Sequence, residues 1–94
     1  MQALSEQQLK DALTNRLNLI EPQFVLEKVG QKWSGNIISQ TFRGREDMQR
    51  QQMLWDALEN KFGKECVHWV GTLLAYTPAE WEVNLEVVPT TGKH

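Results

Sequence analysis

The sequence predicts an α+β domain in which helices pack against a small mixed three-stranded sheet. Two segments repeat apolar residues with the period of a helix, and three others are short and rich in branched or aromatic residues, as strands are. A Gly-bounded connection joins the first two predicted strands as a hairpin. The expected order is helix, strand, strand, helix, strand and short helix, which is typical of a sheet covered by helices.

The first predicted helix begins at Ser5, because Gln8 follows three residues later and completes a capping box. Pro22 should end this helix, since the residue before a proline avoids the helical region. Its apolar stripe consists of Leu9, Ala12, Leu13 and Leu17.

The predicted hairpin has strands at 24–29 and 36–42, joined by a turn at 30–35 that contains Trp33. The second helix should begin with Asp47 as its N-cap and end at Gly63. We expect its buried stripe to contain Met48, Leu54, Trp55, Leu58 and Phe62.

The third predicted strand covers residues 67–75 and carries apolar residues on both faces, which favours a central position in the sheet. Thr77 and Glu80 form a second capping box, with Pro78 at the first helical position. Residues 81–87 then alternate apolar and polar, so we expect an extended segment at 82–88. Residues 1–88 would form one domain, and residues 89–94 a flexible tail.

The composition excludes several function classes. The chain has 94 residues, enough for one domain, and its formal net charge of -2 disfavours a protein that binds nucleic acid mainly through phosphates. Its single cysteine forms no internal disulfide, and three Cys and His residues are too few for a structural zinc site. We find no apolar run long enough to span a bilayer and no signal peptide, so we expect a cytoplasmic protein.

No pattern of catalytic residues is visible. The sequence lacks a nucleophile–histidine–acid motif, a phosphate-binding glycine loop and a paired-carboxylate signature. We therefore expect that the protein is not an enzyme and has no cofactor.

Three motifs resemble the BolA-like family, whose fold is related to the second type of KH domain. The first is Phe42-Arg43-Gly44, and the second is the helical segment from Arg50 to Trp55, which starts eight residues after the phenylalanine, as in the family. The third and most specific is Tyr76-Thr77-Pro78-Ala79-Glu80-Trp81. The resemblance spans about residues 5–82.

This resemblance implies an adaptor that pairs with a monothiol glutaredoxin and shares a bridging [2Fe–2S] cluster with it. It implies a histidine ligand, which we place at the helical motif position held here by Gln51, and a Cys or His in the loop at 30–35, which has neither. An amide is a poor ligand for iron in such a cluster. We therefore expect the fold to carry over without cluster binding.

The candidate partner-binding residues are Trp33, Arg43, Arg45, Arg50 and Gln51. The three arginines would form a basic cluster for an anion or an acidic partner, or would simply be solvated beside Glu46 and Asp47. Trp33 would be an exposed anchor or would pack back over the hairpin, and Gln51 would hydrogen-bond the loop.

Cys66 and His68 are the remaining candidates for metal binding. Two residues apart near the start of a strand, they would share a face, but we favour a small buried thiol and a histidine at the rim.

We retain three hypotheses. The first is an interaction or assembly module without a cluster, whose C-terminal segment adds a strand either within its own domain or to a neighbour, the latter giving a homodimer. The second is a KH-like regulator that binds nucleic acid through the arginines, which the charge and the sequence of the 44–47 loop disfavour. The third is a glutaredoxin-linked iron–sulfur adaptor in which His68 replaces the missing ligand, provided that His68 reaches the loop.

Overall fold

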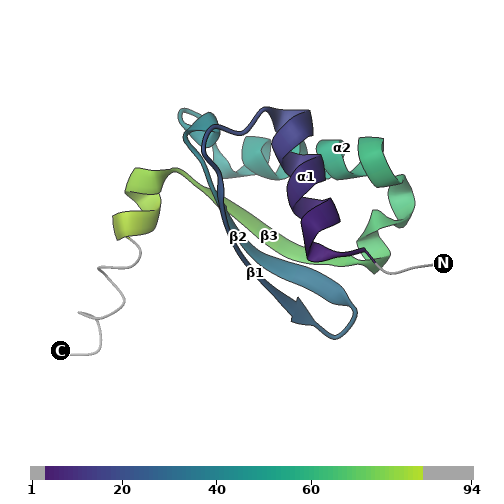
Figure 1. The fold of residues 1–94 in the computed structure, drawn as a ribbon. Coiled ribbons are helices and arrows are strands. Elements are labelled where there is room, and N and C mark those ends of the chain that lie inside the picture. The colour runs from purple at the N-terminus through teal and green to yellow at the C-terminus, as the bar shows by residue number, and fades with distance from the viewer. Residues whose placement is uncertain (1–3, 84–94) are drawn as a thin grey trace, which may run out of the picture.

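A computed structural model describes residues 4–83 and confirms the predicted order of elements (Figure 1). The elements are α1 (Glu6–Leu17), β1 (Gln23–Val29), β2 (Lys32–Ile38), the short 3-10 helix η1 (Gln40–Phe42), α2 (Asp47–Phe62), the 3-10 helix η2 (Lys64–His68), β3 (Val70–Tyr76) and a short helix at 78–83. The extended segment and tail predicted after residue 83 lie outside the described residues.

The sheet is mixed, as predicted. Its order is β1-β2-β3, with β1 antiparallel to β2 and β2 parallel to β3. Both α1 and α2 lie on the same side of the sheet (Figure 1), and we call the opposite side the outer face. The core fills the space between sheet and helices, and its fully buried members include Leu9, Leu13, Ile37, Phe42, Leu54, Leu58, Cys66 and Leu73.

The predicted capping box of α1 is confirmed. The Gln8 amide donates to the Ser5 hydroxyl at 3.1 Å, and the Ser5 amide donates to Oε1 of Gln8 at 2.9 Å. The helix ends before the proline, because Asn18 adopts a left-handed conformation and donates its N–H to Thr14.

The hairpin is tighter than predicted. Its turn comprises only Gly30 and Gln31, so Trp33 lies in β2 and not in the turn. The strand also ends sooner, at Ile38, because the buried Ser39 hydroxyl accepts from the amide of Ile20 and donates to its carbonyl. These bonds turn the chain out of the sheet into η1.

The buried stripe of α2 differs from the predicted one. Glu46, and not Asp47, is the N-cap, and Met48 is 81% exposed. Arg50 takes the core-facing position one turn before Leu54, since the buried residues are Arg50, Leu54, Ala57 and Leu58. Trp55 and Phe62 are half-buried and pack against the core.

The strand β3 is shorter and differently placed than predicted. Residues 64–68 form η2, so Cys66 and His68 belong to a 3-10 helix and not to a strand. β3 lies at the edge of the sheet and is not central. The apolar residue Leu74 on its outer face is 43% exposed, so apolar character on both sides did not indicate burial.

The helix after Pro78 is confirmed and continues through residue 83, so residues 82 and 83 are helical where an extended segment was predicted. No helix among residues 4–83 is long and apolar enough to cross a membrane.

One glycine is required by packing between strands. Gly35 has φ +147°, pairs with Leu26 and lies at an irregularity in the pairing of β2 with β3. A Cβ atom there would lie 2.1 Å from the backbone oxygen of Val25. By contrast, Gly30 in the turn has φ +66°, and a Cβ atom there would meet no other atom within 4 Å.

We therefore expect Gly35→Ala to lower the free energy of unfolding by about 3 kcal/mol or more, because a backbone atom must move to admit the methyl group. Gly30→Ala should cost only about 1 kcal/mol, from backbone strain alone. Urea unfolding followed by circular dichroism measures both variants. Equal losses for the two variants would contradict this account of Gly35.

Candidate functional site

The buried Arg50 side chain organises the first candidate site. It is 6% exposed, and its guanidinium group donates to the carbonyl of Arg45 at 2.8 Å and to the carbonyl of Ala75 at 3.0 Å. It also forms a bidentate pair with Glu80, at 2.7 Å and 3.0 Å. One side chain of α2 therefore contacts the preceding loop, β3 and the C-terminal helix.

Glu80 has a second role as a helix cap. Its Oε1 accepts from the Thr77 amide at 2.9 Å, and its own amide donates to the Thr77 hydroxyl at 3.2 Å, which confirms the predicted capping box. The hydrogen bonds from Arg50, and then from Thr77, lower the pKa of Glu80 to about 2. The hydrogen bond to Glu80 likewise raises the pKa of Arg50.

Gln51 was predicted to hydrogen-bond the loop, but it binds the neighbouring strand β3 instead. Its Nε2 donates to the carbonyl of Leu73 at 2.6 Å. Because the carbonyl of Tyr76 accepts from Ser39 at the end of β2, and successive carbonyls of a strand alternate in direction, those of Leu73 and Ala75 point to the free edge of β3. Gln51 and Arg50 thus cap this edge with side-chain donors.

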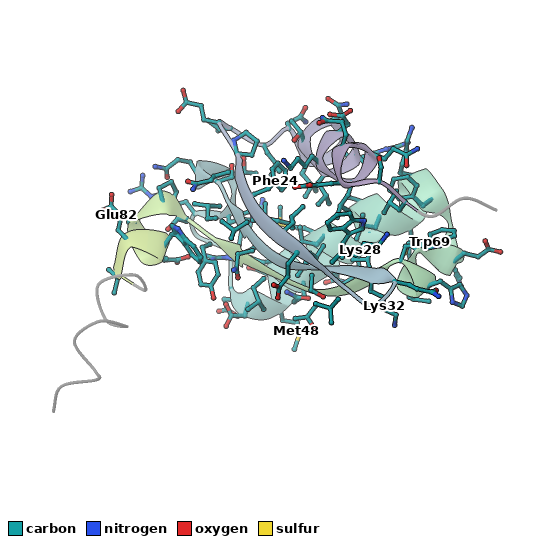
Figure 2. The ribbon with its side chains drawn as sticks, turned by 60° about the horizontal axis from the view of Figure 1, so that its bottom comes forward. Phe24, Lys28, Lys32, Met48, Trp69 and Glu82 are labelled. Atoms are coloured by element: carbon teal, nitrogen blue, oxygen red, sulfur yellow. The ribbon has the colours of Figure 1, made fainter. Side chains whose placement is uncertain are left out.

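A groove lies beside this capped edge. It has a volume of about 320 Å³ and is lined by Asp47, Arg50, Gln51, Leu74, Ala75 and Tyr76. The neighbouring Met48 side chain projects from the rim of the molecule (Figure 2). The groove therefore has a polar wall, in which Arg50 and Gln51 are hydrogen-bonded to β3 and Glu80, and an apolar rim that is exposed.

The three predicted arginines do not form one basic cluster. Arg43 and Arg45 are exposed, whereas Arg50 is buried and is neutralised mainly by Glu80, with a smaller contribution from the charge of Asp47. Two exposed guanidinium groups beside two carboxylates make a weak site for phosphate groups, so this surface does not favour nucleic-acid binding.

Trp33 lies at the other end of the sheet, which we call the hairpin end. The ring is half-buried, its Nε1 donates to the carbonyl of Leu4 at 2.8 Å, and Lys28 Nζ lies 5.6 Å from the ring centroid. Trp33 therefore packs back over the hairpin, the second of the two predicted arrangements. Its backbone N–H donates to the carbonyl of Trp69, which brings η2 beside the hairpin.

The two candidate metal ligands of η2 have different surroundings. Cys66 is fully buried, and burial raises the pKa of its thiol, with a smaller contribution from the charge of Glu59. His68 is exposed, next to Trp69 at the hairpin end (Figure 2 labels Trp69 close to Lys28 and Lys32). They therefore do not share a face, and only His68 offers an accessible donor.

The residue at the α2 position where the resemblance implies a ligand, Gln51, fits a bridging iron–sulfur cluster poorly. The Gln51 amide is an unsuitable ligand and is already bonded to Leu73. Within residues 4–83, no three His, Cys, Asp or Glu side chains come together as a metal site. His68 is the one exposed imidazole in this part of the chain, and the next residue, Trp69, accepts a hydrogen bond from the backbone of Trp33 in β2.

The pH dependence of stability tests the Arg50–Glu80 pair. The pKa of Glu80 is about 2 in the folded chain and near 4.3 when unfolded, so its contribution is complete above about pH 5 and is lost as the pH falls towards 2. Because the Glu80 side chain is 46% exposed, Glu80→Gln should cost only about 1–2 kcal/mol at pH 6.

The difference in unfolding free energy between the native chain and Glu80→Gln should therefore shrink as the pH falls from 5 to 2. Urea unfolding at pH 6, 4 and 2.5 measures this difference. Subtracting the unfolding free energy of one protein from that of the other removes the contribution of the other carboxylates, which titrate in both. An unchanged difference across this range would contradict the assignment.

Comparison with known proteins adds evidence on the fold. No protein-family model and no curated protein matches the chain. Among solved structures, a BolA protein homologue from Coxiella burnetii matches at 22% identity with a TM-score of 0.64, over 84% of this chain and 97% of that one. The BolA domain of SufE1 from Arabidopsis thaliana matches at 22% identity with a TM-score of 0.58, over 83% and 99%.

BolA1 from Arabidopsis thaliana matches at 18% identity with a TM-score of 0.62, over 79% of this chain and 92% of that one. These structures share with this chain nearly their whole length, so the likeness covers a complete domain. At such identities it concerns the fold and not the details of the sites. The chain therefore has the BolA-like fold that its sequence motifs implied.

Proposed function

We propose that this protein is a small non-enzymatic interaction module of BolA-like type, which acts in the cytoplasm by binding a protein partner without a bound cluster. The chemistry of the Arg50 site supports a structural role. Glu80, with a pKa of about 2, stays ionised at neutral pH and is held by Arg50 and Thr77, so it is unsuited to proton transfer.

The partner surface that we propose is the groove between the start of α2 and the edge of β3. The observation that carries it is Met48, which is 81% exposed beside a groove whose wall contains Arg50 and Gln51, both held by hydrogen bonds to β3. Leu74 adds a second exposed apolar side chain, and Arg43 and Arg45 extend from the adjacent loop. Methionine and arginine are enriched at protein interfaces, which makes this composition typical of a binding surface.

A monothiol glutaredoxin is the partner to test first, because the resemblance to the BolA-like family implies it. We expect binding in the absence of iron, measured by isothermal titration calorimetry. Met48→Glu should weaken this binding by about tenfold or more, and Met48→Leu should leave it nearly unchanged, since only the first introduces a charge into the apolar rim. Equal affinities for Met48→Glu and the native chain would remove the groove from the proposal.

The exposed His68 favours one alternative, an adaptor that shares an iron–sulfur cluster with the glutaredoxin. The residue after His68, Trp69, accepts a backbone hydrogen bond from Trp33, so η2 lies beside the hairpin, which supports this alternative. One imidazole is the ligand that this chain would contribute there.

Reconstitution with iron, sulfide and the glutaredoxin separates the two functions. Our leading proposal expects no visible absorbance beyond that of the glutaredoxin alone. A coloured heterodimer that is lost in His68→Ala and kept in Gln51→Ala would establish the alternative instead. Absorbance spectra of the heterodimer fraction from gel filtration give the answer directly.

A further inference from the structure

The outer face of the sheet carries an exposed apolar row, of which the proposed partner surface uses only Leu74. Val25, Asn36 and Leu74 pair across the three strands and therefore lie side by side on this face. Val25 and Leu74 are each 43% exposed, and Asn36 between them is half-buried. Neither α1 nor α2 lies on this side (Figure 1).

The next row along the strands is already partly covered. It consists of Gln23, Ile38 and Tyr76, and Ile38 is only 3% exposed although it points to the outer face. The Tyr76 ring packs against Trp81 of the helix at 78–83, with 5.3 Å between ring centroids. The helix at 78–83 therefore contacts the domain at this end of the outer face.

The residues that follow have a sequence suited to an apolar surface. Leu85 and Val87 alternate with Asn84 and Glu86, which is the period of an extended segment with one apolar side. Five extended residues span about 17 Å, and neighbouring rows on a strand lie about 7 Å apart. The contact of Trp81 with Tyr76 puts the preceding helix beside the neighbouring row, and a segment of this length exceeds the spacing between the two rows.

We propose that residues 84–88 of the same chain pack across this row, with Leu85 and Val87 against Leu74 and Val25. The row matches such a segment in chemistry as well as in reach. Its two apolar side chains can receive the apolar side of the segment, and the Asn36 amide between them has both a donor and an acceptor for an extended backbone. The row shares Leu74 with the groove beside Met48 and otherwise lies on the outer face, and its test uses this chain alone, without a partner.

A spin label at residue 88 tests this placement in the full chain. Val88→Cys introduces one accessible thiol, because the native Cys66 is fully buried. In the labelled, isotope-enriched protein, the amide signals of Val25, Asn36 and Leu74 should lose most of their intensity, whereas those near Glu59 on α2 should keep theirs. Adding Leu85→Ser and Val87→Ser to the labelled chain should restore the lost signals, with the fold confirmed by the remaining spectrum.

Full intensity at Val25 and Leu74 in the labelled chain would overturn the proposal. A second sample mixes labelled chain without isotope with enriched chain without label. Loss of signal at the outer face in this mixture, equal to that in the first sample, would also overturn it, because the occupant would then be the segment of a second copy. No loss in the mixture is the result that we expect.

Discussion

The fold depends on the charge of Arg50 within the buried stripe of α2. A buried guanidinium group without partners would cost several kcal/mol, so its position is compatible only with a structure that supplies acceptors around it. This chain supplies them from three separate segments: the carbonyl of Arg45, the carbonyl of Ala75 and the carboxylate of Glu80. The start of α2, the edge of β3 and the C-terminal helix are therefore fixed by one side chain.

The same arrangement explains how the free edge of β3 is protected. An unpaired edge strand exposes backbone groups that invite pairing with other chains. Here Arg50 and Gln51 bind the outward carbonyls of β3, so the groove beside them presents apolar side chains instead of free backbone acceptors. This favours recognition of a partner through side chains such as Met48, and it leaves His68 on a separate surface at the hairpin end.

Much of the fold was predictable because short-range signals determine it. Ser5 with Gln8, and Thr77 with Glu80, identify two helix starts through contacts three residues apart. The site was harder, because its contacts join residues far apart in sequence. The spacing of Arg50 before Leu54, Ala57 and Leu58 is that of a buried stripe and would have indicated a buried charge, but charged residues are usually assigned to the surface.

Other differences have equally local causes. The strand predicted to start at residue 67 actually starts at Val70, because η2 occupies the preceding residues, and this change exposes His68 while burying Cys66. Branched and aromatic residues alone do not distinguish a strand from a short 3-10 helix. Likewise, no sequence pattern predicted that Gln51 would bind Leu73, since α2 and β3 meet only in the folded chain.

The most direct measurement of the central claim is a double-mutant cycle on Arg50 and Glu80. Unfolding free energies of the native chain, Arg50→Met, Glu80→Gln and the double variant, measured in urea at pH 6, give the coupling between the two side chains. We predict a coupling of about 1–2 kcal/mol, reduced from that of a fully buried pair by the exposure of Glu80. A coupling near zero would show that the two residues act independently and would contradict this account of the fold.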